Sequence, residues 1–174
     1  ESALRSLESG ELQYKARQLA DILDTTDGRL AILTKDNPDP DSIASATALQ
    51  AIAEEFDVDA DILYDGDIGH QENRAFVNLL GIELLSREEA LDMGDYERFA
   101  LVDNMKSDEG SVGMSVDILI DHYEPDEDLD ADFVDIRTNV SSTSTILTKY
   151  LQEFDLSPSE TVATALLYGI RAET

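Results

Sequence analysis

The sequence predicts an α/β fold with a central, mainly parallel sheet and helices on both faces. Strand-like and helix-like segments alternate along the chain. The strand-like segments are apolar at consecutive positions, which is typical of strands covered on both faces. Crossover helices join such strands into parallel sheets. With 174 residues, the chain is long enough for one domain with a substantial core.

Five segments are expected in the first half of the chain. In order, they are a helix over 2–24, a strand over 29–34, a helix over 42–56, a strand over 60–66 and a helix over 72–80. Leucines recur at helical spacing in the first helix, and TTDG ends it. Asp41 or Ser42 is the expected N-cap of the second helix, and Gly81 ends the third.

Five more segments are expected in the second half. They are strands over 98–104, 116–122 and 133–138, followed by helices over 142–154 and 159–170. Serines precede the first of these helices and Pro158 precedes the second, as is common at helix starts. The acidic stretch 124–132 is expected to be a solvated loop.

The charge balance is strongly acidic, with 39 acidic and 12 basic residues and a net charge of −27. A protein that binds duplex DNA needs lysine and arginine to displace counterions from phosphates, so this balance excludes a general duplex-DNA binder. In molar salt the Debye length is only about 3 Å, which screens the repulsion between like charges. We therefore expect a halophilic protein whose acidic surface keeps it in solution.

The composition also bounds the cellular setting. The sequence has no cysteine, which excludes disulfides and thiolate metal sites. It has no apolar run of about 18 residues and no secretory signal. We expect a cytoplasmic protein that makes no membrane contact.

Aspartates are concentrated after the first strand, in the stretch TKDNPDPDSIASA. Asp36, Asp39 and Asp41 lie within six residues there. Carboxylates this close repel one another unless water or a cation separates them. Two further strands also end in side chains that can bind a cation. One ends at Asp103, and the other at Asp121 and His122.

The carboxyl ends of parallel strands meet at one edge of a sheet, where α/β proteins form their sites. Carboxylates with one imidazole and no cysteine suit Mn²⁺ or Mg²⁺ better than Zn²⁺. Two such ions about 3.5–4 Å apart would polarise a phosphoryl oxygen and activate a water. The alternative is that each aspartate is only a cap or turn residue, as Asp41 would be for its helix.

Two other stretches are candidates for phosphate contacts. DIGHQENRAF (67–76) places His70, Asn73 and Arg74 near the end of the second strand; the alternative is an ordinary surface helix start. SSTSTI (141–146) opens a helix with hydroxyls and free N–H groups, which is either an anion site or an ordinary cap.

Four stretches, NPDPDSIAS, LVDN, LIDHY and YGIRAET, resemble in this order the four motifs of the DHH phosphoesterases. The resemblance runs from about Arg29 to Thr174. Within the family, the chain is similar to archaeal RecJ-like proteins. It implies a metal-dependent hydrolase of phosphodiester or phosphoanhydride bonds in short oligonucleotides, cyclic dinucleotides or polyphosphate, as in RecJ exonucleases, nano-RNases and exopolyphosphatases.

The resemblance also divides the chain. Residues 1–27 form an N-terminal helix and residues 28–174 a DHH-like domain. Because the sequence starts at Glu1 and stops at RAET, we interpret it as a fragment of a longer protein that lacks the DHHA1-type domain of the family.

Roles carry over from the family residue by residue. The metal ligands implied are Asp39, Asp41, Asp103, His122 and Glu173, where Glu173 stands in place of an aspartate. The catalytic group implied is Asp121, His122 and Tyr123, where Tyr123 replaces a histidine that contacts phosphate or the leaving group. Lys35 occupies the position of a ligand histidine.

These departures leave two interpretations open. A protonated lysine has donors only and cannot bind a metal, so Lys35 either turns inward and neutralises Asp39 and Asp103, or points to solvent. Tyr123 replaces an imidazole with a phenol, and tyrosine side chains in general, with a model-peptide pKa of about 10, are poor acids or bases at neutral pH. The domain is therefore a phosphoesterase with one or two Mn²⁺ or Mg²⁺ ions, or a degenerate domain that binds a nucleotide, another phosphate-containing small molecule or a partner without turnover. A homodimer is compatible with both.

Overall fold

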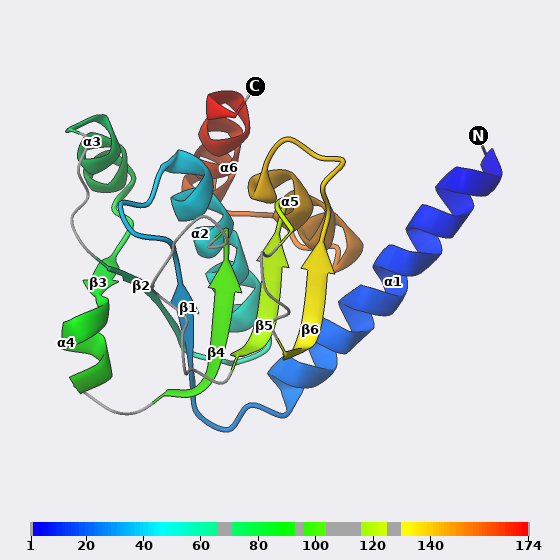
Figure 1. The fold of residues 1–174 in the computed structure, drawn as a ribbon, viewed down its shortest axis with the longest axis horizontal. Coiled ribbons are helices and arrows are strands. Elements are labelled where there is room, and N and C mark those ends of the chain that lie inside the picture. Colours follow the sequence, from blue (N-terminus) through cyan, green and yellow to red (C-terminus); the bar gives the residue numbers. More distant parts are fainter. Residues whose placement is uncertain (1, 66–70, 93–95, 104–115, 125–129, 174) are drawn as a thin grey trace.

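A computed structural model describes residues 2–65, 71–92, 96–103, 116–124 and 130–173. Its six strands form one sheet (Figure 1). They are β1 (Arg29–Leu33), β2 (Ala60–Tyr64), β3 (Leu84–Ser86), β4 (Tyr96–Val102), β5 (Val116–Asp121) and β6 (Ala131–Ile136). The helices are α1 (Ser2–Asp24), α2 (Pro40–Glu55), α3 (Gln71–Leu80), α4 (Arg87–Asp92), α5 (Thr143–Glu153) and α6 (Glu160–Ala172).

The sheet is parallel throughout and has the order β3-β2-β1-β4-β5-β6. The chain starts at β1, moves outward to β3, and then returns to the other side of β1 at β4. The direction of winding therefore reverses between β1 and β4. In open α/β sheets the loops that leave such a switch point diverge and form a crevice at the carboxyl ends of the strands.

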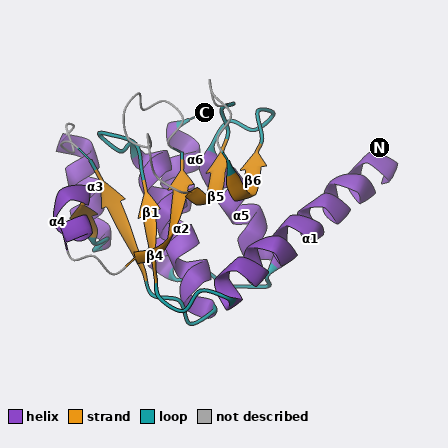
Figure 2. Ribbon diagram, turned by 60° about the horizontal axis from the view of Figure 1, so that its bottom comes forward, coloured by secondary structure: helices purple, strands orange, loops and turns teal. Residues whose placement is uncertain are grey.

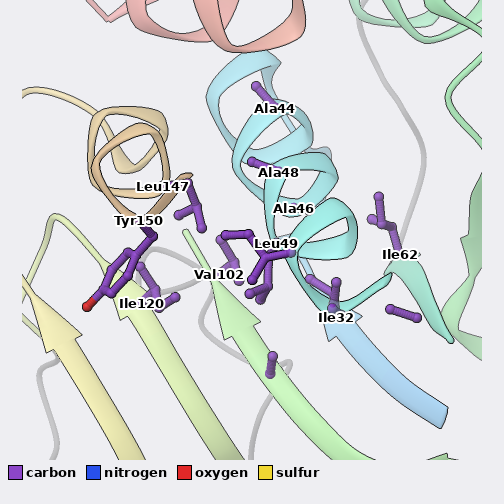
Figure 3. Packing of buried hydrophobic residues seen from close by; sticks show 14 of the residues in the cluster. Ile32, Ala44, Ala46, Ala48, Leu49, Ile62, Val102, Ile120, Leu147 and Tyr150 are labelled. Carbon is purple, nitrogen blue, oxygen red and sulfur yellow. The ribbon is translucent and has the colours of Figure 1, made fainter. Parts of the chain in front are cut away.

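The main core lies between one face of the sheet and the helices α1, α2 and α5. Helix α2 is the centre of this layer and is buried along most of its length, because α5 and α6 also pack against it. Its small residues Ala44, Ala46 and Ala48 let the neighbouring helices approach closely, while Leu49 fills the space above β1 and β4 (Figure 3).

A second apolar cluster covers the other face of the sheet. Leu33, Leu63 and Leu101 from three neighbouring strands pack there with Ala90 of α4. The α/β class, the parallel sheet and the helices on both faces are thus confirmed. Figure 2 shows α3 and α4 at one edge of the sheet and α1 beside the other edge.

The sequence prediction missed β3 and α4, because a strand of three residues and a helix of six are too short to show a periodic pattern. The expected N-cap of α2 was also wrong. The helix begins at Pro40 and is capped by Asp39, since proline is favoured at the first helical position. In the described part of the chain, no helix combines the length and apolar character that a membrane span requires.

Candidate metal centre

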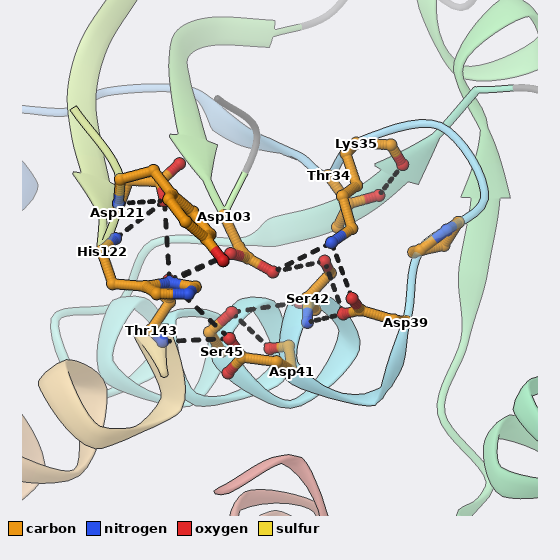
Figure 4. A network of polar contacts seen from close by, with 12 residues as sticks. Thr34, Lys35, Asp39, Asp41, Ser42, Ser45, Asp103, Asp121, His122 and Thr143 are labelled. Atoms are coloured by element: carbon orange, nitrogen blue, oxygen red, sulfur yellow. Dashed lines mark hydrogen bonds and ion pairs between the residues drawn. The ribbon is translucent and has the colours of Figure 1, made fainter. Parts of the chain in front are cut away.

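The polar side chains of the site lie where the winding of the sheet reverses (Figure 4). Asp39 and Asp41 follow β1, Asp103 follows β4, and Asp121 ends β5 with His122 after it. The amino ends of α2 and α5 close the site from below in this view. The strand ends that the sequence predicted to meet do meet.

Lys35 turns inward rather than to solvent. Its Nζ lies 2.6 Å from Asp39 Oδ2 and 3.7 Å from Asp103 Oδ2. Burial alone would lower the pKa of Lys35, but Asp103 and then Asp39 outweigh it, so the pKa is raised. For Asp39, burial is outweighed by hydrogen bonds from Lys35 and Ser42, and its pKa is lowered. The pair is therefore an ammonium and a carboxylate at neutral pH.

Asp41 is fully buried at the amino end of α5. Its Oδ1 accepts hydrogen bonds from Ser144 N at 2.8 Å and Ser144 Oγ at 2.6 Å, and its Oδ2 accepts one from Thr143 N at 3.0 Å. The free N–H groups predicted at SSTSTI thus do bind an anion, and it is the chain's own carboxylate. Ser142 caps the same helix by accepting a hydrogen bond from Thr145 N at 3.1 Å.

Asp103 adopts a left-handed backbone conformation with φ of 53°. This conformation is uncommon outside glycine, although aspartate tolerates it better than most residues. It aims a nearly buried carboxylate into the site, where Oδ2 lies 2.6 Å from Ser42 Oγ and Oδ1 lies 3.1 Å from Thr143 Oγ1. Backbone strain of this kind is often found at functional sites.

His122 points its Nδ1 into the site. This atom lies 2.7 Å from Thr143 Oγ1, 3.4 Å from Asp103 Oδ1 and 3.9 Å from Asp41 Oδ2. Asp121 shapes the turn that holds the ring, because its Oδ1 accepts hydrogen bonds from His122 N at 2.7 Å and Tyr123 N at 3.1 Å. The ring of Tyr123 lies 4.3 Å from that of His122 and is 39% exposed, at the rim of the site.

Three of these residues form a candidate metal site, here called the Asp–Asp–His cluster. Asp41, Asp103 and His122 each offer one ligand atom, and these atoms lie within 4.8 Å of one another. Two carboxylate oxygens and one imidazole nitrogen suit a divalent cation such as Mn²⁺ or Mg²⁺. The residues therefore fit the metal that the resemblance implies.

The electrostatics of the cluster also favour a cation. Burial, and next the charge of Asp41, raises the pKa of Asp103 to about 8. Burial likewise raises the pKa of Asp41, although the donors from Ser144 and Thr143 oppose this. Two buried carboxylates are costly to ionise together unless a positive charge lies between them.

The other predicted site residues lie outside this cluster. Asp39 is paired with Lys35. Glu173 is the exposed C-cap of α6. Partial burial, and next the charges of Asp39 and Asp41, raise its pKa, so its carboxylate interacts electrostatically with the site. The ligand roles of Asp39 and Glu173 and the catalytic roles of Asp121 and Tyr123 stay predictions.

The three residues of the stretch 67–76 that were predicted to contact phosphate differ in their surroundings. His70 lies outside the described residues. Asn73 is buried and donates to the backbone oxygen of Pro38 at 3.4 Å, so it braces the loop after β1. Arg74 is exposed, and its phosphate contact stays a prediction.

Three hydroxyl residues complete the site and were not among the predicted ligands. Ser42, Thr143 and Ser144 are fully buried and each bonds to a site carboxylate. Their functional signal in the sequence was weak, because serine and threonine before a helix are equally typical of a cap.

Comparison with known proteins places these features in a family. The model of the DHH family, N-terminal domain, matches residues 29–170. An uncharacterized protein of Methanocaldococcus jannaschii is 48% identical over 146 residues, which cover 83% of this chain and 30% of that protein.

Solved structures share the fold at low sequence identity. An exopolyphosphatase-related protein from Bacteroides fragilis superposes with a TM-score of 0.76 at 17% identity, covering 93% of this chain and 50% of that one. A RecJ exonuclease determined with bound manganese gives a TM-score of 0.54 at 14% identity, covering 94% of this chain and 43% of that one. The chain thus spans at most half the length of these relatives.

Proposed function

Because the chain belongs to the DHH family, as its four motifs indicated, we propose that it is a phosphoesterase domain that uses one divalent cation, with Lys35 as a second, built-in positive charge. The observation that carries this proposal is the Asp–Asp–His cluster, whose three ligand atoms lie within 4.8 Å of one another. Mn²⁺ or Mg²⁺ fits these ligands, and a RecJ relative was determined with manganese.

When bound, the cation would polarise a phosphoryl oxygen and lower the pKa of a water molecule. The chain's own residues supply the rest. Lys35 is a compact positive charge beside Asp103, suited to hold a phosphate oxygen. Tyr123 lies at the exposed rim next to His122, where its hydroxyl can donate a hydrogen bond to substrate.

The substrate class proposed is a phosphodiester or phosphoanhydride of short oligonucleotides, cyclic dinucleotides or polyphosphate. The names of two solved neighbours, an exopolyphosphatase-related protein and an exonuclease, support this range. The net charge of −27 supports a halophilic cytoplasm as the working environment, so we propose molar KCl for assays. His70 and Arg74 are proposed phosphate contacts, and a homodimer is the proposed assembly.

A second candidate is a domain that binds a nucleotide or partner without turnover. The contact that favours it is the 2.6 Å ion pair of Lys35 with Asp39, which engages a carboxylate that the family uses as a ligand. Tyr123, in place of a histidine, also removes a group that could exchange a proton near neutral pH.

The test is Mn²⁺-dependent release of p-nitrophenol from bis(p-nitrophenyl) phosphate in molar KCl. We expect turnover in the wild type and at least about a 100-fold loss in Asp103→Asn, because that variant removes one charged ligand. Asp36→Asn is the matched control, since Asp36 is exposed in the same loop. Mn²⁺ binding without turnover would instead support the second candidate.

A further inference from the structure

The geometry of the site points to a ligand that the motifs do not include: we propose that the hydroxyl oxygen of Thr143 binds the cation together with Asp41, Asp103 and His122. This inference rests on the proposed metal site and adds one residue to it. Thr143 comes from a stretch predicted to be only a helix cap or an anion site, and it lies outside the four stretches that resemble the family's motifs.

The first support is the spacing of the ligand atoms. Thr143 Oγ1, His122 Nδ1 and Asp103 Oδ1 form a triangle with sides of 2.7, 3.1 and 3.4 Å. An octahedral site with metal–ligand distances of about 2.0–2.2 Å separates neighbouring ligands by about 2.8–3.1 Å. The three atoms therefore already have nearly the spacing of one face of an octahedron.

The second support is that the Thr143 side chain is held in place. It is fully buried, and it is the first residue of α5, directly after the Ser142 cap. Its backbone N–H donates to Asp41 Oδ2 at 3.0 Å, so the same residue is fixed to another member of the cluster. A hydroxyl held this way loses little conformational freedom when a cation binds.

The third support is charge. Asp41 and Asp103 together balance a divalent cation, so further ligands should be neutral. His122, when its imidazole is neutral, and Thr143 meet this condition. A hydroxyl oxygen can bind a metal through a lone pair while its proton is donated to another acceptor. Threonine and serine hydroxyls bind Mg²⁺ in the same manner in P-loop enzymes.

The competing role for Thr143 is a hydrogen-bonded spacer between His122 and Asp103 that never contacts the metal. Removal of the hydroxyl would weaken binding in either case. The two roles differ when the oxygen is replaced by sulfur, because a thiolate prefers a soft cation and would bind it directly only from a ligand position.

The experiment begins with Mn²⁺ titrations of the whole chain in molar KCl. Thr143→Val keeps the shape but loses the oxygen, and we expect its dissociation constant to rise at least about 10-fold, whereas Thr143→Ser should stay within about 3-fold of wild type. Thr148→Val is the matched control on the same helix, because the Thr148 hydroxyl bonds to the backbone oxygen of Ser144 and should leave Mn²⁺ affinity unchanged.

The decisive variant is Thr143→Cys titrated with Cd²⁺. The chain has no cysteine, so any thiolate-to-cadmium absorption band must come from the introduced residue. We expect this band, and a preference for Cd²⁺ over Mn²⁺ at least about 10-fold greater than in wild type. Wild-type Mn²⁺ affinity in Thr143→Val, or Cd²⁺ binding by the cysteine variant without the band, would overturn the assignment of Thr143 alone. Failure of the wild type to bind Mn²⁺ would overturn the proposed metal site as well.

Discussion

Lys35 Nζ lies 2.6 Å from Asp39 Oδ2, inside the site rather than in solvent. The same ammonium is 3.7 Å from Asp103 Oδ2, so one lysine compensates two carboxylates. The resemblance to the family implies that Lys35 stands at the position of a histidine that binds metal. We therefore propose that the lysine supplies a permanent positive charge in place of one cation of a two-metal site.

Removing this charge should destabilise the metal-free protein. We expect Lys35→Met to lower the free energy of unfolding by about 2 kcal/mol, because a partly buried carboxylate loses its counter-ion. Urea unfolding in molar KCl with a chelator measures the change. Lys149→Met, a half-buried lysine on α5, should change the value by less than about 0.5 kcal/mol. Equal values for the two variants would mean that Lys35 is not an internal counter-ion.

Restoring the family residue should restore a second ion. We expect Lys35→His to bind two Mn²⁺ where the wild type binds one, because an imidazole nitrogen can bind a metal and an ammonium cannot. Combining it with Tyr123→His should raise hydrolysis of the phosphodiester reporter. If both the stoichiometry and the rate stay at wild-type values, the two substitutions do not limit the site.

The buried Asp103 should make the metal-free protein less stable as the pH rises. The pKa of Asp103 is raised from 3.8 to about 8 in the folded state, so the folded state binds more protons than the unfolded state between these values. The contribution of Asp103 to stability therefore falls with rising pH across this interval and is constant above it.

Asp103→Asn isolates that contribution. In chelator, the free energy of unfolding of Asp103→Asn minus that of wild type should increase from pH 4 to about pH 8 and then level off. Chemical unfolding at several pH values gives this difference. A difference that is independent of pH would show that Asp103 titrates normally.

Gly169 of α6 should tolerate no side chain. A Cβ there would lie 2.8 Å from Ser144 Oγ and 2.9 Å from Ala44 Cβ. We expect Gly169→Ala to cost about 1–3 kcal/mol through overpacking. It should also weaken Mn²⁺ binding, because Ser144 Oγ donates to Asp41 at 2.6 Å.

The control for that variant is Gly10→Ala in α1, where a Cβ meets nothing within 4 Å. This change should leave stability unchanged or raise it by up to about 1 kcal/mol through helix propensity. Thermal unfolding of both variants makes the comparison. If the two variants are equally stable, packing does not restrict position 169 to glycine.

Much of the fold followed from the sequence because long apolar strands and amphipathic helices carry clear periodic signals. Helix α1 was predicted with its observed bounds, whereas β3 and α4 were too short to be detected. The meeting of Asp41, Asp103 and His122 was also predictable, since parallel strands end at the same edge of the sheet.

The internal contacts of the site were not predictable from spacing. That Asp41 would bind the amino end of α5, about a hundred residues later in the chain, depends on how α2 and α5 pack together. Whether Lys35 would turn inward depends on the balance between burial and two carboxylates, which sequence position alone does not define.

The most direct test of the account is calorimetric titration of the wild type and Asp103→Asn with Mn²⁺ in molar KCl. We predict one bound ion in the wild type and none in the variant, because we propose that Lys35 takes the place of a second ion and that Asp103 binds the first. Two ions in the wild type would show that Lys35 moves aside and is not a built-in cation. Absence of binding, or equal binding by Asp103→Asn, would contradict the metal site itself.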